Sequence, residues 1–285
     1  MTSKVTFWGT RGSIPTPGPD TTRYGGNTPC LAVEGPKGHV VILDAGTGIR
    51  KLGRVLAERG DGSLRAEILL SHTHWDHIQG LPFFAPFFGA GNRITIRGAP
   101  QGGVPLADIL RQQMHPMVFP VPLDAVAADL AVEHVDEGSF EVGGFSVSAL
   151  RVRHPGTALG YRLHHPSDGS TIVYVTDNEL GDGGEYDEGP RWRDRFLEFV
   201  AGAHVLIHDA MYTPEQIMQF AGWGHSSFSE AVAVARAAEV KQLALFHHHP
   251  EHSDSILDAI VARARADAGD ALEVFAAREG MTLTL

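Results

Sequence analysis

The chain has a single cysteine, no long apolar run and fewer basic than acidic residues. Cys30 is the only cysteine in 285 residues, which excludes an internal disulfide and a metal cluster held by several thiolates. No apolar stretch approaches the about 18 residues that a membrane span needs. The opening MTSKVTFWGT lacks the charged and apolar regions of a secretory signal. We therefore expect a soluble, cytoplasmic protein that does not associate with a membrane.

The acidic balance also limits the choice of partner. The formal net charge is -11, with 23 Lys and Arg residues against 34 Asp and Glu residues. A protein of this charge has no general affinity for nucleic acid, because binding to a phosphate backbone depends on basic contacts. We expect no stable nucleic acid complex, although a local basic patch around an anionic substrate is compatible with the total.

Strand-like runs and amphipathic helices succeed one another along the chain. In the first half we predict strands over 5–8, 31–34, 40–43, 66–70 and 94–97, and helices over 49–59 and 106–114. In the second half we predict strands over 145–152, 159–164, 171–176, 205–207, 243–246 and 273–276, and helices over 191–200, 229–238 and 256–266. Neither a repeat nor a linker interrupts this pattern. We expect an α/β fold in a single domain spanning 1–285, with packed sheets and helices outside.

The segment AEILLSHTHWDHIQG carries four potential metal ligands within six positions. A buried strand leads into this segment, and we predict that 75–80 begins a short helix. Residues two apart in an extended chain point the same way, so His72 and His74 can reach one metal together. Asp76 and His77 follow where the chain turns and can reach a second metal. The alternative is a histidine-rich turn without a metal, which the placement directly after a buried strand disfavours.

Further residues of the ligand type stand at the ends of later predicted strands. His154 follows FSVSALRVR, Asp177 follows TIVYVT, and His247 follows QLALF. Each residue alone is also compatible with a surface loop, but their shared placement favours ligands. Imidazole and carboxylate groups suit zinc, manganese or iron. The sequence therefore predicts divalent metal ions without naming the metal.

The motif HTHWDH resembles the HxHxDH motif of the metallo-β-lactamase superfamily, whose later motifs match the order of the three strand-end residues. The resemblance implies a four-layer αββα sandwich and two divalent metal ions, with zinc as the first candidate. It also implies one metal held by His72, His74 and His154, another held by Asp76, His77 and His247, and Asp177 as the bridge. Histidine at position 74, where the flavodiiron branch has glutamate, favours hydrolysis over electron transfer.

The stretches FWGTRGSIPTPG…RYGGNTPCLAV and VLIHDAMYTPEQ…GHSSFSEAVAVARAAEVKQLALFHHHP are similar to parts of ribonuclease Z and its phosphodiesterase relatives. His225, Ser226 and Ser227 resemble the His-Ser-Thr motif of that group, and Asp209 stands where the group usually has glutamate. The resemblance implies that His225 contacts the scissile phosphate and protonates the leaving oxygen, and that Asp209 orients His225. The alternative for His225 is a histidine near the start of the helix over 229–238, and the shorter aspartate leaves the pairing open.

These residues lead us to expect a dinuclear metal-dependent hydrolase. Asp76, His225 and Asp209 form the expected catalytic set, and a hydroxide that bridges the two metals would attack the phosphorus. We find no basic, glycine-rich arm like that of ribonuclease Z, which favours a small, for example cyclic, phosphodiester or nucleotide. The alternatives are a thioester or lactone hydrolase on the same scaffold, and a nucleotide-binding sensor that kept the metals without catalysis.

The sequence allows more than one role for two apolar segments and for two glycine-rich turns. Phe83–Phe88 and Met114–Pro122 are compatible with core packing, with a lid beside the pocket or with a dimer surface. Relatives of this group often form dimers, so a homodimer is compatible with the sequence. We predict turns at Gly9–Gly12 and Gly25–Gly26, although glycine there would also let backbone amides approach a phosphate.

Overall fold

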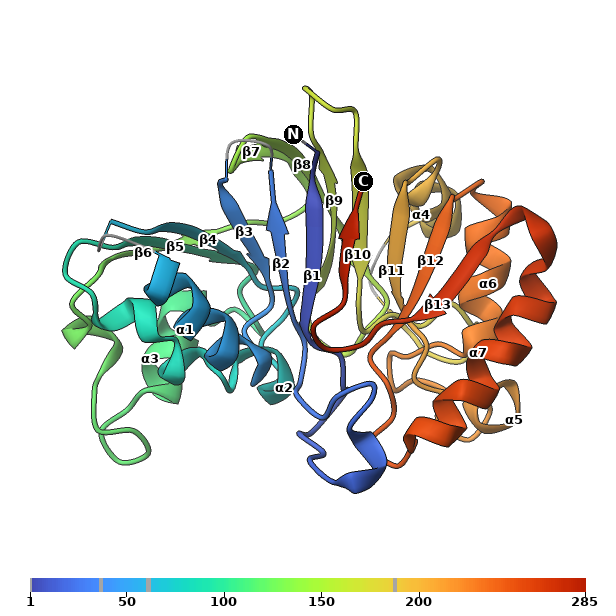
Figure 1. Cartoon of the computed structure of the whole chain (residues 1–285), viewed down its shortest axis with the longest axis horizontal. Helices are drawn as coiled ribbons and strands as arrows, with labels where there is room; N and C mark the ends of the chain where they lie inside the picture. The colour runs from blue at the N-terminus through green and yellow to red at the C-terminus, as the bar shows by residue number, and fades with distance from the viewer. Residues whose placement is uncertain (1, 36–37, 60–62, 187–188) are drawn as a thin grey trace.

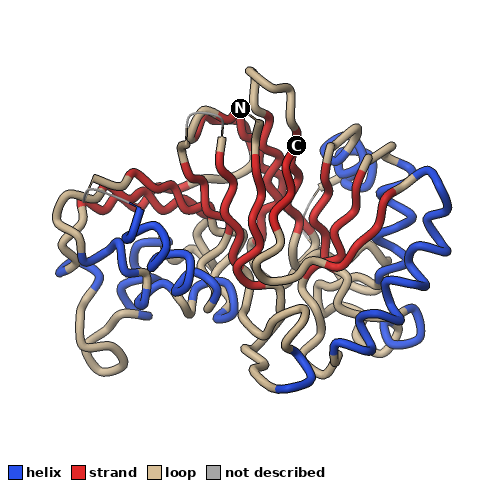
Figure 2. Tube along the Cα trace, in the orientation of Figure 1, coloured by secondary structure: helices blue, strands red, loops and turns tan. Residues whose placement is uncertain are grey.

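The computed structural model describes residues 2–35, 38–59, 63–186 and 189–285. Two seven-stranded sheets pack face to face, and helices cover the outer side of each sheet (Figure 1). The layers are plain in Figure 2, where the helices flank the strands on both sides. The predicted αββα sandwich is confirmed. Within the described residues, no helix combines the length and apolar character needed to cross a bilayer.

The first sheet contains the N-terminal strands and the last strand of the chain. Its order is β14 (Thr282–Thr284), β1 (Lys4–Gly9), β2 (Cys30–Glu34), β3 (Val40–Leu43), β4 (Arg65–Leu69), β5 (Arg93–Gly98) and β6 (Asp129–His134). Strands β3 to β6 are parallel, so their carboxyl ends meet at one edge of the sheet. The helices on this side are α1 (Gly48–Arg59), α2 (Trp75–Ile78) and α3 (Leu106–Gln113).

The second sheet is formed by the later part of the chain. Its order is β13 (Glu273–Ala276), β12 (Gln242–Phe246), β11 (Val205–Asp209), β10 (Thr171–Val175), β9 (Ala158–His164), β8 (Phe145–Val152) and β7 (Gly138–Val142). Strands β10 to β13 are parallel, and β7 to β9 are antiparallel. The helices on this side are α4 (Trp192–Val200), α5 (Pro214–Ile217), α6 (Phe228–Ala237) and α7 (Asp254–Ala268). Short 3-10 helices lie at Pro19–Thr21, Leu81–Phe83, Ala85–Phe88, Leu123–Ala125 and Gly269–Ala271.

The composition of the strands follows from burial on two faces. Strands β3 (VVIL) and β10 (TIVYV) are buried at every position, because each has the other sheet on one side and helices on the other. Phe7, Tyr161 and Phe246 lie in the core between the sheets. Helix α1 buries Ile49, Leu52 and Leu56 against the outer face of the first sheet, as its spacing predicts. A third apolar cluster lies between the second sheet and its helices, so the core consists of three layers.

The sequence patterns do not predict strands β6, β7 and β14, and their exposure explains why. All three lie at an edge of their sheet. Strand β7 (GSFEV) has one buried residue, and β14 (TLT) has none. An edge strand with few buried positions shows no apolar pattern that distinguishes it from a loop.

The two apolar segments divide between core and surface. Phe84 and Phe87 are fully buried beneath α1, whereas Phe83 is 58% exposed. In the second segment Met114 is buried, and Met117 is 87% exposed. Core packing therefore accounts for part of each segment, and the rest is exposed apolar surface.

Candidate metal centre and active site

The strand ends bring the predicted site residues to one edge of the sandwich. His72 follows β4, Asp177 follows β10, and His247 follows β12. Asp209 is the last residue of β11, and His154 comes two residues after β8. Both sheets therefore contribute to the site, which lies at the carboxyl ends of parallel strands. Open α/β sheets usually bind their ligands at this edge.

One cluster consists of His72, His74, His154 and Asp177, whose potential ligand atoms all lie within 4.8 Å of one another. The Nε2 atom of His154 is 3.0 Å from Nδ1 of His74. The Oδ2 atom of Asp177 is 3.8 Å from Nε2 of His72 and 3.7 Å from Nε2 of His154. His74 is exposed and the other three residues are buried, so the cluster opens to solvent beside His74.

A second cluster consists of Asp76, His77, Asp177 and His247. The Oδ1 atom of Asp177 is 3.1 Å from Nε2 of both His77 and His247. The Oδ2 atom of Asp76 is 3.1 Å from Nε2 of His77 and 3.0 Å from Nε2 of His247. Asp177 thus belongs to both clusters and turns one oxygen toward each. The structure brings all seven predicted ligands together, and their role as ligands stays a prediction.

Two buried nitrogens test whether these residues fit a metal. Among the described residues, Nε2 of His72 has no hydrogen-bond partner, and Nε2 of His77 lies 3.1 Å from oxygens of Asp76 and Asp177 without forming a hydrogen bond of suitable geometry to either. Leaving a buried polar atom without a partner costs about 1–3 kcal/mol. Both atoms face Asp177, so cations on either side of its carboxylate would satisfy them. Nitrogen and oxygen donors of this kind fit zinc, manganese or iron.

The protonation states also suit metal binding. Burial lowers the pKa of His72, His74 and His154, and the pKa of His154 falls to about 4. These imidazoles are neutral at pH 7, which is the form that binds a metal. Burial opposes the charged form of His77 as well, but the surrounding carboxylates, led by Asp76, raise its pKa well above the usual value. The carboxylates therefore favour a positive charge at this place, which a cation would supply.

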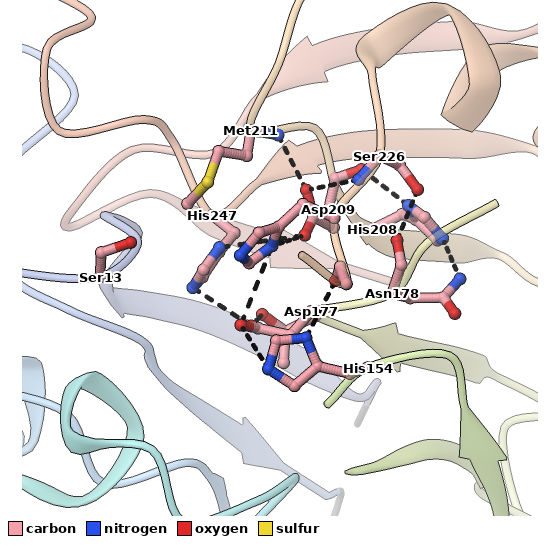
Figure 3. A network of polar contacts seen from close by, with 12 residues as sticks. Ser13, His154, Asp177, Asn178, His208, Asp209, Met211, Ser226 and His247 are labelled. Atoms are coloured by element: carbon pink, nitrogen blue, oxygen red, sulfur yellow. Dashed lines mark hydrogen bonds and ion pairs between the residues drawn. The ribbon is translucent and has the colours of Figure 1, made fainter. Parts of the chain in front are cut away.

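His225 and Asp209 pair beside the two clusters. Nδ1 of His225 is 2.6 Å from Oδ2 of Asp209, and its ring stacks on His247 at 5.2 Å between centroids. Figure 3 shows Asp209 close to His247 and Asp177, with its other oxygen accepting a hydrogen bond from the backbone of Met211 at 2.8 Å. Burial disfavours the imidazolium, but Asp209 outweighs that effect and raises the pKa of His225 to about 9. The pair therefore keeps a proton donor at neutral pH.

A comparison with known families identifies the chain. The family described as a Beta-lactamase superfamily domain matches residues 39–248. The protein belongs to the β-lactamase superfamily.

Individual relatives within the superfamily agree with this assignment. A ribonuclease Z of Bradyrhizobium diazoefficiens is 27% identical over 300 residues, which cover 91% of this chain and 94% of that protein. The metallo-beta-lactamase fold protein YhfI of Bacillus subtilis has a TM-score of 0.70 at 24% identity, with 99% of both chains covered. The short form of human tRNase Z has a TM-score of 0.65 at 22% identity, with 98% of both chains covered. The prediction of a metal-dependent hydrolase, similar in sequence to ribonuclease Z, is confirmed at the level of the superfamily.

Asp44 also belongs to the site, although the sequence patterns did not identify it. It follows β3, and its Oδ2 atom is 2.8 Å from Nδ1 of His77. The same oxygen accepts hydrogen bonds from Ser71 at 2.8 Å and from the Tyr174 hydroxyl, which comes from the second sheet, at 2.6 Å. With a proton on Nδ1, His77 turns the lone pair of Nε2 toward the cluster. The place of Asp44 at the end of a buried strand is the same signal that identified Asp177.

Unusual backbone conformations gather at the site. Ser13, Asp44 and His247 have φ angles of 63°, 59° and 58°, and they are three of the five described non-glycine residues with positive φ. Each such conformation costs about 1–3 kcal/mol and persists where the surrounding structure requires it. Ser13 uses it to donate its backbone N–H to Oδ2 of Asp76 at 2.8 Å. Gly12 allows His247 close approach, because a Cβ at Gly12 would lie 2.7 Å from the His247 ring.

Two residues next to the site, Ser227 and Arg11, stabilise the chain segments that carry the site residues. Ser227, and not His225, caps α6 through a hydrogen bond from the backbone of Glu230. Arg11 is fully buried and donates to the carbonyls of His249 and His252 at 3.0 and 2.7 Å. Arg11 thereby ties the first loop of the chain to the loop that follows His247.

Proposed function

We propose that the protein is a phosphodiesterase that cleaves a small phosphodiester with two divalent metal ions. The observation that carries the proposal is the pairing of His225 with Asp209 beside two ligand clusters that share Asp177. Cleavage of a P–O bond benefits from an acid that protonates the departing oxygen. A thiolate leaves without such help because thiols are much stronger acids than alcohols, so the pairing favours a phosphodiester over a thioester.

The residues of the chain have distinct roles in this mechanism. When bound, divalent metal ions supply hydroxide at neutral pH and offset the charge that grows on the phosphoryl oxygens. The proposed ligands are His72, His74 and His154 on one side, Asp76, His77 and His247 on the other, and Asp177 between them. His225 donates the proton on Nε2 to the leaving oxygen, while its Nδ1 stays bonded to Asp209. Asp209 fixes the ring and favours the imidazolium before transfer, and such an acid contributes about 10²–10⁴-fold in rate.

The charge and the surface of the site favour a small ligand over a long RNA. The net charge is -11, and the guanidinium groups of Arg11 and Arg153 both donate to backbone carbonyls. A long RNA needs several basic contacts to its phosphates. Trp75, within the metal motif, is 81% exposed, and Trp223, two residues before His225, is 60% exposed. These rings offer apolar surface on which a nucleobase can stack.

An RNA phosphodiester is the second candidate substrate. Relatives named ribonuclease Z favour it, because one of them matches 91% of this chain. The competing functions are a thioester or lactone hydrolase and a nucleotide-binding sensor without catalysis. The homodimer and the cytoplasmic location stay predictions.

A substrate panel distinguishes these functions. Metal-free protein is loaded with zinc, manganese or iron(II) and assayed on bis-p-nitrophenyl phosphate, cyclic nucleotides, a 3′-extended precursor tRNA, a thioester and a lactone. We expect the highest kcat/KM on the small phosphodiesters. Faster cleavage of the precursor tRNA would replace the small substrate with RNA. Turnover of the thioester or lactone alone, or tight binding of a cyclic nucleotide without turnover, would contradict the proposal.

A further inference from the structure

Glu179 is a buried acidic residue with no role in the mechanism above. It comes two residues after Asp177, and it is 2% exposed. Its Oε2 atom accepts three hydrogen bonds, from the Tyr186 hydroxyl at 2.6 Å and from the backbone N–H groups of Gly222 and Gly224 at 2.9 and 3.1 Å. Removing a carboxylate from water costs free energy unless several donors compensate. Three donors on one oxygen give that compensation and bind the segment 222–224 to Glu179.

The segment that Glu179 binds also orients a proposed metal ligand. Nδ1 of His154 lies 3.0 Å from the carbonyl oxygen of Gly224. A hydrogen bond to this carbonyl places the proton on Nδ1 and leaves Nε2, which faces His74 and Asp177, free to bind a metal. Glycine is required at position 224, where φ is 81° and a Cβ would overlap Nδ1 of His154. The position of the Gly224 carbonyl therefore sets the orientation and the protonation of the His154 ring with respect to a metal.

The same segment leads directly into the proposed general acid. His225 follows Gly224, and the next residue, Ser226, is tied to the neighbours of Glu179 on both sides. The Ser226 hydroxyl donates to the carbonyl of Asn178 at 2.5 Å and accepts from the backbone N–H of Leu180 at 3.1 Å. Residues 178–180 thus bind the chain both before and after His225.

We infer that Glu179 is a positioning residue that couples the cluster of His72, His74 and His154 to the general acid. It acts through the Gly224 carbonyl on His154 and through the segment 222–224 on His225. The part that concerns His225 rests on the proposed function, whereas the part that concerns His154 needs only a metal at the site.

A graded set of substitutions tests this inference by metal affinity. The variants are Glu179→Ala, Glu179→Gln and Tyr186→Phe, with Glu185→Ala as a control at an exposed position of the same loop. Zinc is titrated from the loaded protein with a chromophoric chelator. We expect Glu179→Ala to weaken one of the two zinc equivalents by about 10–100-fold, the usual effect of losing an outer partner of a ligand, and to leave the other unchanged. Glu179→Gln keeps an accepting oxygen and Tyr186→Phe loses one donor, so both effects should be smaller.

Several outcomes would overturn the inference. Equal weakening of both equivalents, or no weakening of either, contradicts a role through His154. A lower melting temperature with both equivalents retained and an unchanged kcat at saturating zinc would assign Glu179 a purely structural role. If Glu179→Ala does not fold, Glu179→Gln and Tyr186→Phe decide the result. The chelator titration involves no phosphodiester, so a wild-type protein without phosphodiesterase activity would refute the proposed function and leave this test intact.

Discussion

The two sheets contribute to the site in different ways. The first sheet supplies His72, His74, Asp76 and His77 from six consecutive residues after β4. The second sheet supplies its residues from separate strand ends and loops, namely His154, Asp177, Asp209, His225 and His247. Local chain geometry arranges the first group, whereas the second depends on the alignment of several strands. Each group nevertheless has a buried carboxylate behind it, Asp44 in the first and Glu179 in the second.

Asp177 belongs to both ligand clusters, so its replacement should have the largest effect on metal content and activity. We expect Asp177→Asn to lose both metal equivalents, because one oxygen faces each cluster and the amide provides no second negative oxygen. Activity should fall by more than the about 100-fold typical of outer partners. Metal content by elemental analysis and kcat on bis-p-nitrophenyl phosphate measure the effect, with the exposed Asp182→Asn as the control. Retention of one tightly bound equivalent would mean that the clusters do not share Asp177 as a ligand.

Substitution of His225 should lower turnover without lowering the metal content. We expect His225→Ala to lower kcat by about 10²–10⁴-fold and to keep the metal content of the wild type. Asp209→Asn should give a smaller loss, since the ring remains but its orientation and charge are less favoured. The atoms of Asp209, His225 and His247 also lie close enough to hold a cation. An equal loss of metal in His225→Ala would therefore reassign His225 as a ligand.

Replacing Asp44 tests whether the two ligand clusters are supported independently of each other. We expect Asp44→Asn to weaken the metal equivalent held by Asp76, His77 and His247 by about 10–100-fold, because His77 loses its charged partner. The other equivalent, which depends on Glu179 through His154, should keep its affinity. Chelator titration of both single variants and of the double variant measures this. If Asp44→Asn and Glu179→Ala weaken the same metal equivalent, the two ligand clusters share one support, and the proposed separate roles of Asp44 and Glu179 are wrong.

The difference between the two groups of site residues, one from each sheet, also explains how much of the site could be predicted from the sequence. Spacing alone predicts the first group, because four residues of the ligand type rarely fall within six positions unless they bind a metal. In the second group, His154, Asp177 and His247 are predicted from their place after buried strands, whereas Asp209 and His225 are expected only from the resemblance to ribonuclease Z. The bounds predicted for β3, β8 and β13 agree with the structure at every residue. Those strands have enough buried positions to show their pattern, whereas the exposed edge strand β7 does not.

The contacts of the supporting carboxylates could not be predicted in the same way, although Asp44 also follows a buried strand. Asp44 meets the Tyr174 hydroxyl across 130 residues of sequence, and Glu179 meets the Gly224 N–H across 45. Such contacts depend on the order and register of the strands, which the strand-like runs do not determine. A buried carboxylate also looks like a surface residue in the sequence until the groups that donate to it are known.

Asp168 forms a hydrogen-bonded link between the two sheets. We expect its substitution to have the smallest effect of those considered, and to act on stability and not on the metals. Asp168 lies in the turn between β9 and β10, and Ser3 immediately precedes β1. Oδ2 of Asp168 accepts from the backbone and the hydroxyl of Ser3 at 2.7 and 2.8 Å. Burial works against its charged form, but hydrogen bonds from Ser170 and Ser3 outweigh that effect and lower the pKa of Asp168 to about 2 from 3.8. The folded state therefore prefers the ionised carboxylate more strongly than the unfolded chain does.

The sign of this shift sets the pH dependence of the link. Because the folded pKa is below the unfolded value, the contribution to stability is present above about pH 4 and is lost as the pH falls toward 2. We expect Asp168→Asn to lower the free energy of unfolding of the metal-free protein slightly at pH 6, since solvent screens a partly exposed carboxylate. The difference between wild type and variant, measured by urea unfolding, should shrink as the pH falls below 4. A difference that stays constant down to pH 2 would show that the Asp168 charge does not stabilise the link, and unchanged zinc affinities would show that the site does not depend on it.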